Sequence, residues 1–389
     1  MTRALDAFLA LHDNAIRAGY CGYEFDDLLA SRIVRLLAGD SLIRQRVAVQ
    51  VGERLPVNVR PLLGVPKLES TKARSFFAKG YLWLYASTSD RHWLGAATAS
   101  LDWLLQHPST GYRGLSWGNH FDFASRAGFF PKHLPTVVWS AHIAEAMALA
   151  SSVIPDPRYR DAVERVADFI VMDLGMTEDA HGICLHYAPG VPAEIHNSNL
   201  LGAAILARAS DQRNEPKWRE IAIRSYQWSL HHWQSDGSWL YGVGPRYHWS
   251  DNFHTAYVIE SLLTGHNLLG EEEVPWPVIE RSVTYWITNF FGSDGTPNYY
   301  NDRTYPLDIQ CAAQAIETLS RLSDRFAACG PLASKTLTWT LDRMRKPNGA
   351  FRYQIHRRIR NNLESFHWGQ ATMLSALGAY LYHVNPEAS

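Results

Sequence analysis

A twelve-residue pattern that occurs twice constrains this chain more than any other feature. Asp251–Leu262 and Asp308–Leu319 both read D-x4-A-x2-I-E-[S/T]-L, and their first residues lie 57 positions apart. A repeat of this period is typical of a supersecondary unit that cannot bury its apolar face alone and stacks on neighbouring units. The chain is therefore expected to be an array of such units.

Similar apolar segments recur along the rest of the chain. They begin at Phe76, Thr136, His196 and Trp368, so six segments follow one another at intervals of 55 to 60 residues. These segments are rich in Ala and Gly and apolar on most sides, which is typical of buried helices. Second helices with one polar face are expected between them, at about 91–105, 157–173, 215–232, 274–290 and 331–345.

Six inner helices need six outer partners, and the chain ends soon after the sixth inner segment. The N-terminal region is expected to supply the missing partner, with a helical stretch at about 25–50. We predict an all-α fold, an (α/α)6 toroid of six helical hairpins. It forms a single domain, 1–389, in which the N-terminal helical region (about 1–70) closes the ring. An open helical solenoid is the alternative.

The long connections of this arrangement all enter an inner helix at its N-terminus, so they gather at one mouth of the ring. Some contain short β pieces, for example 238–241 and 350–354. Functional residues concentrate on loops that a rigid scaffold holds, and helix N-termini favour electronegative groups. The site is therefore expected at this mouth.

Composition narrows the class of partner and the location. The formal net charge is −1, which argues against a nucleic-acid or acidic-membrane partner. No run of 18 apolar residues exists, so no membrane span is expected. The four cysteines show no CxxC pairing, and the first 16 residues do not read as a signal peptide, so we expect a cytoplasmic protein. The oligomeric state is left open.

The mouth loops are dense in aromatic and polar side chains, in a chain with 14 Trp, 18 Tyr, 15 Phe and 17 His. Aromatic rings with polar edges suit ligands that offer apolar faces and many hydroxyls. We therefore expect a poly- or oligosaccharide ligand, although aromatics can also serve only to pack long loops together. The substrate-binding candidates are Arg60, Trp117, His120, His196, Asn197, Trp249, Tyr300, Glu364, Trp368 and Gln370.

Glycoside hydrolysis requires two carboxyl groups that flank the scissile bond. Asp122, Asp251 and Asp308 are the catalytic candidates at the mouth, with His254 as an acid or base. Glu364 is a further carboxyl candidate at the mouth, and Glu194 and Asp302 are lower-ranked candidates. Helix capping is the alternative role for Asp251 and Asp308, and a position in the core is the alternative for His254. Asp26-Asp27 is given little weight as an acid motif of the kind that toroidal terpene cyclases use.

A uronate lyase or C5-epimerase is the second hypothesis. Such an enzyme needs a base, an opposing acid and a group that neutralises the substrate carboxylate. The acid and base candidates are His120, His196, His254, Tyr247 and Tyr300, and the carboxylate could be held by Arg246, Arg303, Asn197 or Gln370.

Asp308, Cys311 and His367 could form a zinc site, as in a prenyl or terpenoid enzyme of toroidal shape. The spacing is loose, and Cys311 fits a small core residue better, so no metal is predicted. Glycine-rich phosphate loops and GxSxG, HExxH or DxDD motifs are absent from the sequence, and no cofactor is predicted.

Several strings resemble the VpsJ-type bacterial proteins of exopolysaccharide biosynthesis clusters, from about residue 20 to the end. The strings are Asn58–Gly64, Trp117–Asp122, Pro135–Val138, Asn197–Gly202, Asp251–Thr255, Tyr305–Ile309 and Trp368–Ala371. The resemblance implies a six-hairpin glycosidase-like toroid that makes or trims a surface polysaccharide. Glycoside hydrolysis is our first hypothesis for the function. Uronate lyase or epimerase activity and a non-catalytic oligosaccharide-binding role are the alternatives.

Overall fold

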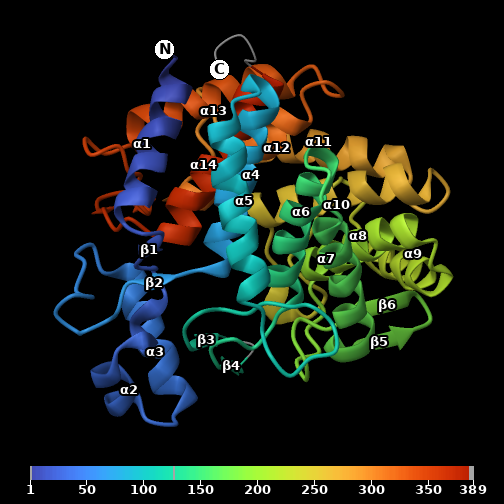
Figure 1. Cartoon of the computed structure of the whole chain (residues 1–389), viewed down its shortest axis with the longest axis horizontal. Coiled ribbons are helices and arrows are strands. Elements are labelled where there is room, and N and C mark those ends of the chain that lie inside the picture. The colour runs from blue at the N-terminus through green and yellow to red at the C-terminus, as the bar shows by residue number, and fades with distance from the viewer. Residues whose placement is uncertain (1, 126–127, 385–389) are drawn as a thin grey trace.

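The six apolar segments form the inner helices of a closed ring in the computed structural model, which describes residues 2–125 and 128–384 (Figure 1). Each inner helix contacts the next, and the last contacts the first. The toroid is therefore confirmed, and the open solenoid is wrong. The inner helices are α4 (Thr71–Thr88), α6 (Val137–Val153), α8 (His196–Arg213), α10 (Asn252–Leu269), α12 (Ile309–Arg321) and α14 (Thr372–His383), the last preceded by the π-helical turn η4 (Phe366–Ala371).

Outer helices cover the ring, and each packs on an inner partner through one apolar face. In α7 the buried residues Tyr159, Ala162, Val163 and Val166 follow helical spacing, and the opposite face is polar. The outer helices are α1 (Arg3–Arg17), α5 (Arg91–Gln106), α7 (Pro157–Phe169, extended by η2, Ile170–Leu174), α9 (Pro216–His231), α11 (Trp276–Asn289) and α13 (Cys329–Arg343).

The sixth outer helix is α1, which packs on α14. Its buried residues Ala4, Ala7, Phe8, Leu11 and Ala15 form the apolar stripe that a ring partner needs. The expectation that about 25–50 would take this place is wrong. That segment forms η1 (Asp27–Ala30), α2 (Arg32–Ala38) and α3 (Leu42–Arg54), which contact one another and β3. We call residues 27–54 the N-terminal lobe, and it projects from the ring at the lower left of Figure 1.

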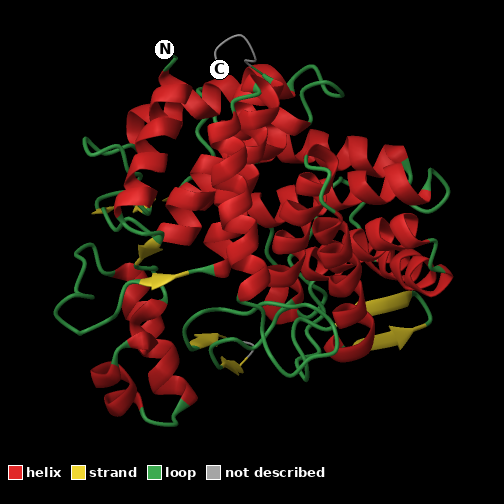
Figure 2. Cartoon of the chain, viewed as in Figure 1, coloured by secondary structure: helices red, strands yellow, loops and turns green. Residues whose placement is uncertain are grey.

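Short antiparallel strands occur in the connections, and several lie on the lower side of the ring (Figure 2). Asp308 faces Gln354 in the β7–β8 register. The strands pair as β1 (Cys21–Gly22) with β2 (Leu68–Glu69), β3 (Phe123–Ser125) with β4 (Gly128–Phe130), β5 (Met176–Asp179) with β6 (Gly182–Leu185), and β8 (Gln354–Ile355) with both β7 (Leu307–Asp308) and β9 (Arg360–Asn361). A further short turn is η3 (Pro245–Tyr247). Among the described residues, every helix is too short or too polar to cross a bilayer.

The glutamate of the repeated pattern builds a buried ion cluster inside the ring. Glu145, Glu260 and Glu317 stand at the same phase of α6, α10 and α12, each nine residues after the first position of its segment. Lys79 of α4 lies 2.5 Å from Glu317 and 3.4 Å from Glu145. Arg321 lies 2.9 Å from Glu145 and also pairs with Glu260. Opposite charges thus link four inner helices, and this second acid of the repeat is structural.

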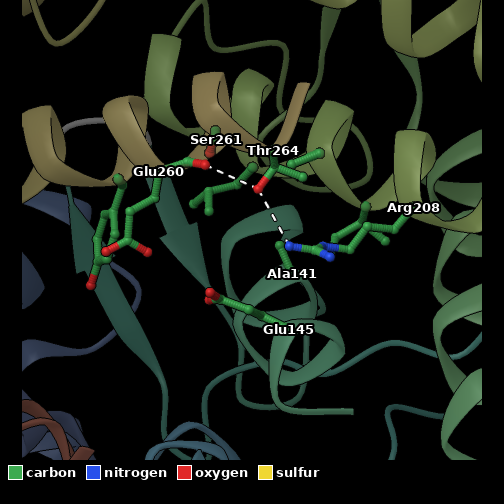
Figure 3. A pocket seen from close by; sticks show the side chains of 10 residues that line it. Ala141, Glu145, Arg208, Glu260, Ser261 and Thr264 are labelled. Atoms are coloured by element: carbon green, nitrogen blue, oxygen red, sulfur yellow. Dashed lines mark hydrogen bonds between the residues drawn. The ribbon is translucent and has the colours of Figure 1, made fainter. Parts of the chain in front are cut away.

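A small cavity of about 20 Å³ lies beside this cluster, lined by Glu145, Glu260 and Arg208 among others (Figure 3). Arg208 donates a hydrogen bond of 3.4 Å to Thr264, whose hydroxyl donates to the Glu260 carbonyl at 3.0 Å. A volume of this order has room for about one water molecule. The cavity is therefore too small for a sugar, and the site must be sought at the mouth.

Candidate functional site

A cavity of about 390 Å³ opens at the mouth, within the size range of small-molecule sites. Its walls come from the N-terminal ends of inner helices, the mouth loops and the N-terminal lobe. Tyr241 stacks on Trp249 with ring centroids 4.6 Å apart, which places flat aromatic faces at the wall. The polar lining consists of Asp26, Glu53, Lys72, Asn119, Ser125, Thr136, Asn197, His254 and His367, among aromatic rings that include Phe25, Trp139, Tyr187, Phe253, Tyr257, Tyr299 and Trp368.

Asp251 and His254 form a dyad on the first turn of α10. The Asp251 Oδ1 atom accepts the backbone N–H of His254 at 3.0 Å, so the expected helix capping is present. Its Oδ2 atom lies 2.7 Å from His254 Nδ1 and accepts the Trp249 indole N–H at 3.1 Å. The Asp251 side chain is 1% exposed, whereas His254 is 22% exposed and lines the cavity. Asp251 therefore orients the His254 ring at the wall of the cavity.

A second histidine of the cavity also has a buried carboxylate behind it. His367 Nδ1 lies 2.9 Å from Glu24 Oε1, in a close contact that lacks hydrogen-bond geometry. Glu24 is buried and also accepts the Ser365 hydroxyl at 2.5 Å. In the sequence, His367 was a mouth-loop residue and a possible zinc ligand, and Glu24 was not a candidate. This pair could not be predicted from the sequence because its two residues are 343 positions apart.

Lys72, the second residue of α4, is a buried cation at the cavity wall. Its side chain has no carboxylate within ion-pair distance in the described part of the chain, and the residue is 3% exposed. The Nζ atom lies 5.0 Å from the centre of the Trp368 ring and 5.3 Å from that of Trp139. Burial lowers the pKa of Lys72 to about 8, although the Asp26 and Glu24 carboxyls oppose this shift. The sequence signal that was missed is a lysine in the first turn of an inner helix.

Two carboxyl groups reach the cavity from the N-terminal region. Burial raises the pKa of Glu53 to about 7, and the Asp308 carboxyl adds to the rise. Burial also raises the pKa of Asp26 well above its usual value, with further contributions from Glu24 and Glu53. The Asp26 Oδ1 atom is buried without a hydrogen-bond partner. Asp26, which was given little weight in the sequence, lines this cavity.

The other predicted carboxyls are held by protein partners instead of lining the cavity. Asp122 pairs with Arg35 and accepts the Lys132 backbone N–H at 2.8 Å. Asp308 caps α12 through the Gln310 N–H at 2.7 Å and accepts the Gln354 amide at 2.6 Å, and burial raises its pKa to about 6. Glu364 pairs with Lys346 and, together with Gln370, lines a separate groove of about 550 Å³.

Of the predicted binding residues, the structure brings Asn197, Trp249 and Trp368 to the cavity beside His254. Four others lie outside the lining of this cavity and contact other parts of the protein. Arg60 is buried and pairs with Asp27 at 2.5 Å, and Trp117 donates to the Leu104 carbonyl at 3.0 Å. Gln370 accepts a hydrogen bond from the Phe351 backbone N–H. Tyr300 packs against Arg303, whose guanidinium carbon lies 4.1 Å from the centre of the Tyr300 ring.

The remaining two predicted histidines lie outside the lining of the cavity: His196 is buried and His120 is half-buried. His196 packs between Trp228 and Trp239, and burial lowers its pKa to about 3. His120 lies 5.9 Å from the His367 ring, and burial lowers its pKa well below the usual value. The described residues contain no cluster of three His, Cys, Asp or Glu side chains that could hold a metal.

The same fold occurs in carbohydrate-active enzymes of known structure. A cellobiose 2-epimerase from Bacillus thermoamylovorans superposes with a TM-score of 0.64 at 9% identity, over 82% of this chain and 90% of that one. A GH76 α-mannanase from Bacteroides thetaiotaomicron gives 0.63 at 13%, over 80% and 86%. A family 88 glycosyl hydrolase from Bacteroides vulgatus gives 0.56 at 11%, over 79% and 90%. This likeness shows a six-hairpin glycosidase-like fold.

No protein-family model matches the sequence, and no curated protein matches it significantly.

Proposed function

We propose that the chain is a carbohydrate-active enzyme that transfers a proton on an acidic sugar, as a uronate C5-epimerase or lyase. One observation carries this proposal: the mouth cavity combines two histidines, each next to a buried carboxylate, with a lysine that forms no ion pair with any described residue. Proton abstraction next to a carboxylate needs such a set, namely a base, an acid and a cation.

The geometry suggests the following roles. One histidine removes the proton from C5 of the uronate, and the electron pair of the C–H bond moves into the carboxylate. Lys72 neutralises the resulting negative charge. An epimerase then returns a proton to the opposite face of C5. A lyase instead expels the oxygen at C4, which takes up a proton, and a double bond forms between C4 and C5.

Aromatic walls and polar edges are consistent with a sugar ring in this cavity. The charged and amide groups of its lining make an apolar prenyl chain a poor fit. The sequence strings shared with VpsJ-type proteins support a role in making or trimming a bacterial exopolysaccharide. The epimerase among the structural neighbours is consistent with proton-transfer chemistry on this fold.

Glycoside hydrolysis stays as a second candidate because Asp26 and Glu53 both line the cavity. Raised pKa values suit a carboxyl that must donate a proton, and hydrolysis needs one such acid beside an ionised partner. In this case the catalytic pair would come from the N-terminal region and not from the repeated aspartates.

The two candidates predict different products from a panel of polyuronates and neutral polysaccharides. Proton transfer yields C5 epimers or unsaturated ends, and activity falls in His254→Gln and Lys72→Met but persists in His266→Gln, a control at the other end of α10. Hydrolysis yields saturated reducing ends and depends on Asp26 and Glu53. If the wild-type protein binds a glycan but forms none of these products, it is a non-catalytic binding component and both candidates fail.

A further inference from the structure

The N-terminal lobe exposes an apolar stripe that the ring does not use. Ile33, Leu36 and Leu37 of α2 are 53%, 84% and 71% exposed. Ile43, Val47 and Val51 of α3 are 74%, 55% and 47% exposed. The spacings of three and four residues place each trio on one face of its helix. Single exposed apolar residues are common on proteins, but a contiguous set marks an interaction surface.

The opposite face of the N-terminal lobe contacts the mouth loop and attaches the lobe to the ring. Val49 is buried with Leu29 and Ala124 in a small core of its own, and Arg35 pairs with Asp122 on the mouth loop. Gly52 packs so closely on Leu28 that an added Cβ would lie 2.8 Å from its side chain. The lobe is thus anchored by one face, and its exposed stripe points away from the anchoring contacts.

Charge identifies the partner of this stripe. Residues 32–54 contain five arginines and two acidic residues, a net charge of +3 in a chain whose net charge is −1. Arg32, Arg44 and Arg54 are exposed. Self-association of this face would bring like charges together, which disfavours a second copy. The exposed apolar side chains of α2 and α3 are all aliphatic, whereas protein interfaces favour aromatic anchors.

We propose that the N-terminal lobe docks on an anionic bilayer surface, with its aliphatic stripe among the acyl chains and its arginines at the headgroups. Basic amphipathic helices bind membranes in this way without crossing them. The net charge is summed over the whole chain and therefore does not show this local basic patch. The proposal differs in this respect from the expectation that the protein has no acidic-membrane partner. Glu53 of the same lobe lines the mouth cavity, so docking would also hold the mouth close to the bilayer. The inference does not depend on the proposed function.

Vesicle co-sedimentation with the full chain tests this proposal. We expect binding to vesicles of phosphatidylcholine with phosphatidylglycerol and little binding to phosphatidylcholine alone, with a loss of affinity at high salt. Leu36→Ser/Leu37→Ser should weaken binding about tenfold or more, because two exposed leucines no longer insert. Arg32→Gln/Arg44→Gln should weaken binding to the anionic vesicles only.

Ile16→Ser is the matched control, because Ile16 is 52% exposed but lies on α1, outside the lobe. This variant should bind like the wild type. Equal binding by the Leu36→Ser/Leu37→Ser variant, or no binding of the wild type to either vesicle, would overturn the proposal. Concentration-dependent dimers in analytical ultracentrifugation that the same double variant abolishes would assign the stripe to a second copy instead.

Discussion

The repeated aspartates offer a matched pair of substitutions, Asp251→Asn and Asp308→Asn. Each native side chain caps an inner helix through its Oδ1 atom, which accepts a backbone N–H at 3.0 Å in Asp251 and 2.7 Å in Asp308. Asparagine caps helices about as well as aspartate, so both variants should remain folded. Only Asp251 also contacts a histidine, at 2.7 Å from His254 Nδ1.

The expected loss of activity in Asp251→Asn follows from the tautomer of the His254 ring. A carboxylate beside Nδ1 keeps a proton on that nitrogen and leaves Nε2 able to accept one. An asparagine amide that turns its N–H₂ toward Nδ1 favours the opposite tautomer, which cannot act as a base at Nε2. Loss of an orienting carboxylate in a comparable histidine dyad costs about 10⁴ in rate. We expect a loss of roughly 10² to 10⁴ for Asp251→Asn, or about 3–5 kcal/mol in activation free energy.

Two measurements check this prediction. Activity on the glycan that the wild type converts should fall in Asp251→Asn and stay within a few-fold in Asp308→Asn. Nitrogen NMR of the histidine rings should show the Nε2–H tautomer of His254 in Asp251→Asn only. The reasoning is refuted if both variants lose activity equally, or if Asp251→Asn changes the tautomer but keeps full activity.

Three further predictions concern stability. Glu317→Gln removes the partner 2.5 Å from buried Lys79 and should lower the free energy of unfolding in urea by about 2–4 kcal/mol, while exposed Glu280→Gln should change little. Gly80→Ala would place its Cβ 2.7 Å from a backbone carbonyl oxygen of α14 and should lower the melting temperature of the protein. In Gly95→Ala the new Cβ meets nothing within 4 Å, so this variant should be more stable than the wild type by about 0.5–1 kcal/mol. Equal shifts of the melting temperature in the two variants would contradict this prediction. Burial raises the pKa of Glu53 to about 7, so its protonated form favours folding at acidic pH and that contribution is lost as pH rises through about 7. Glu53→Gln should therefore gain stability over the wild type above neutral pH but not at acidic pH, and parallel pH profiles would argue against it.

Periodicity predicted the ring because one apolar segment at each interval of 55 to 60 residues is enough to define six buried helices. At Asp251, the capping of α10 and the contact with His254 both follow from a local spacing of three residues. The role of Glu260 and Glu317 was not foreseen. Glu317 pairs with Lys79 of α4 and Glu260 pairs with Arg321 of α12, and these contacts between helices appear only when the ring is closed.

The other half of the site depends on contacts that no local pattern encodes. Glu24 reaches His367 only because the N-terminal region crosses to the last inner helix. Lys72 becomes a buried cation only when Trp139 and Trp368 close around it. The apolar stripe of α1 that closes the ring lies within the predicted closing region of about 1–70, but the role of the outer helix was assigned to the stretch at about 25–50.

Proton exchange at C5 of a uronate tests the central claim most directly. The wild-type protein is incubated with polyuronate in D₂O. NMR and mass spectrometry then measure the deuterium at C5 of the recovered sugar and the amount of unsaturated ends. We predict deuterium at C5 of epimerised residues, or C5 protons lost to solvent with formation of unsaturated ends, and a loss of either result in His254→Gln and Lys72→Met. Saturated products with cleaved glycosidic bonds and no exchange at C5 would contradict the claim.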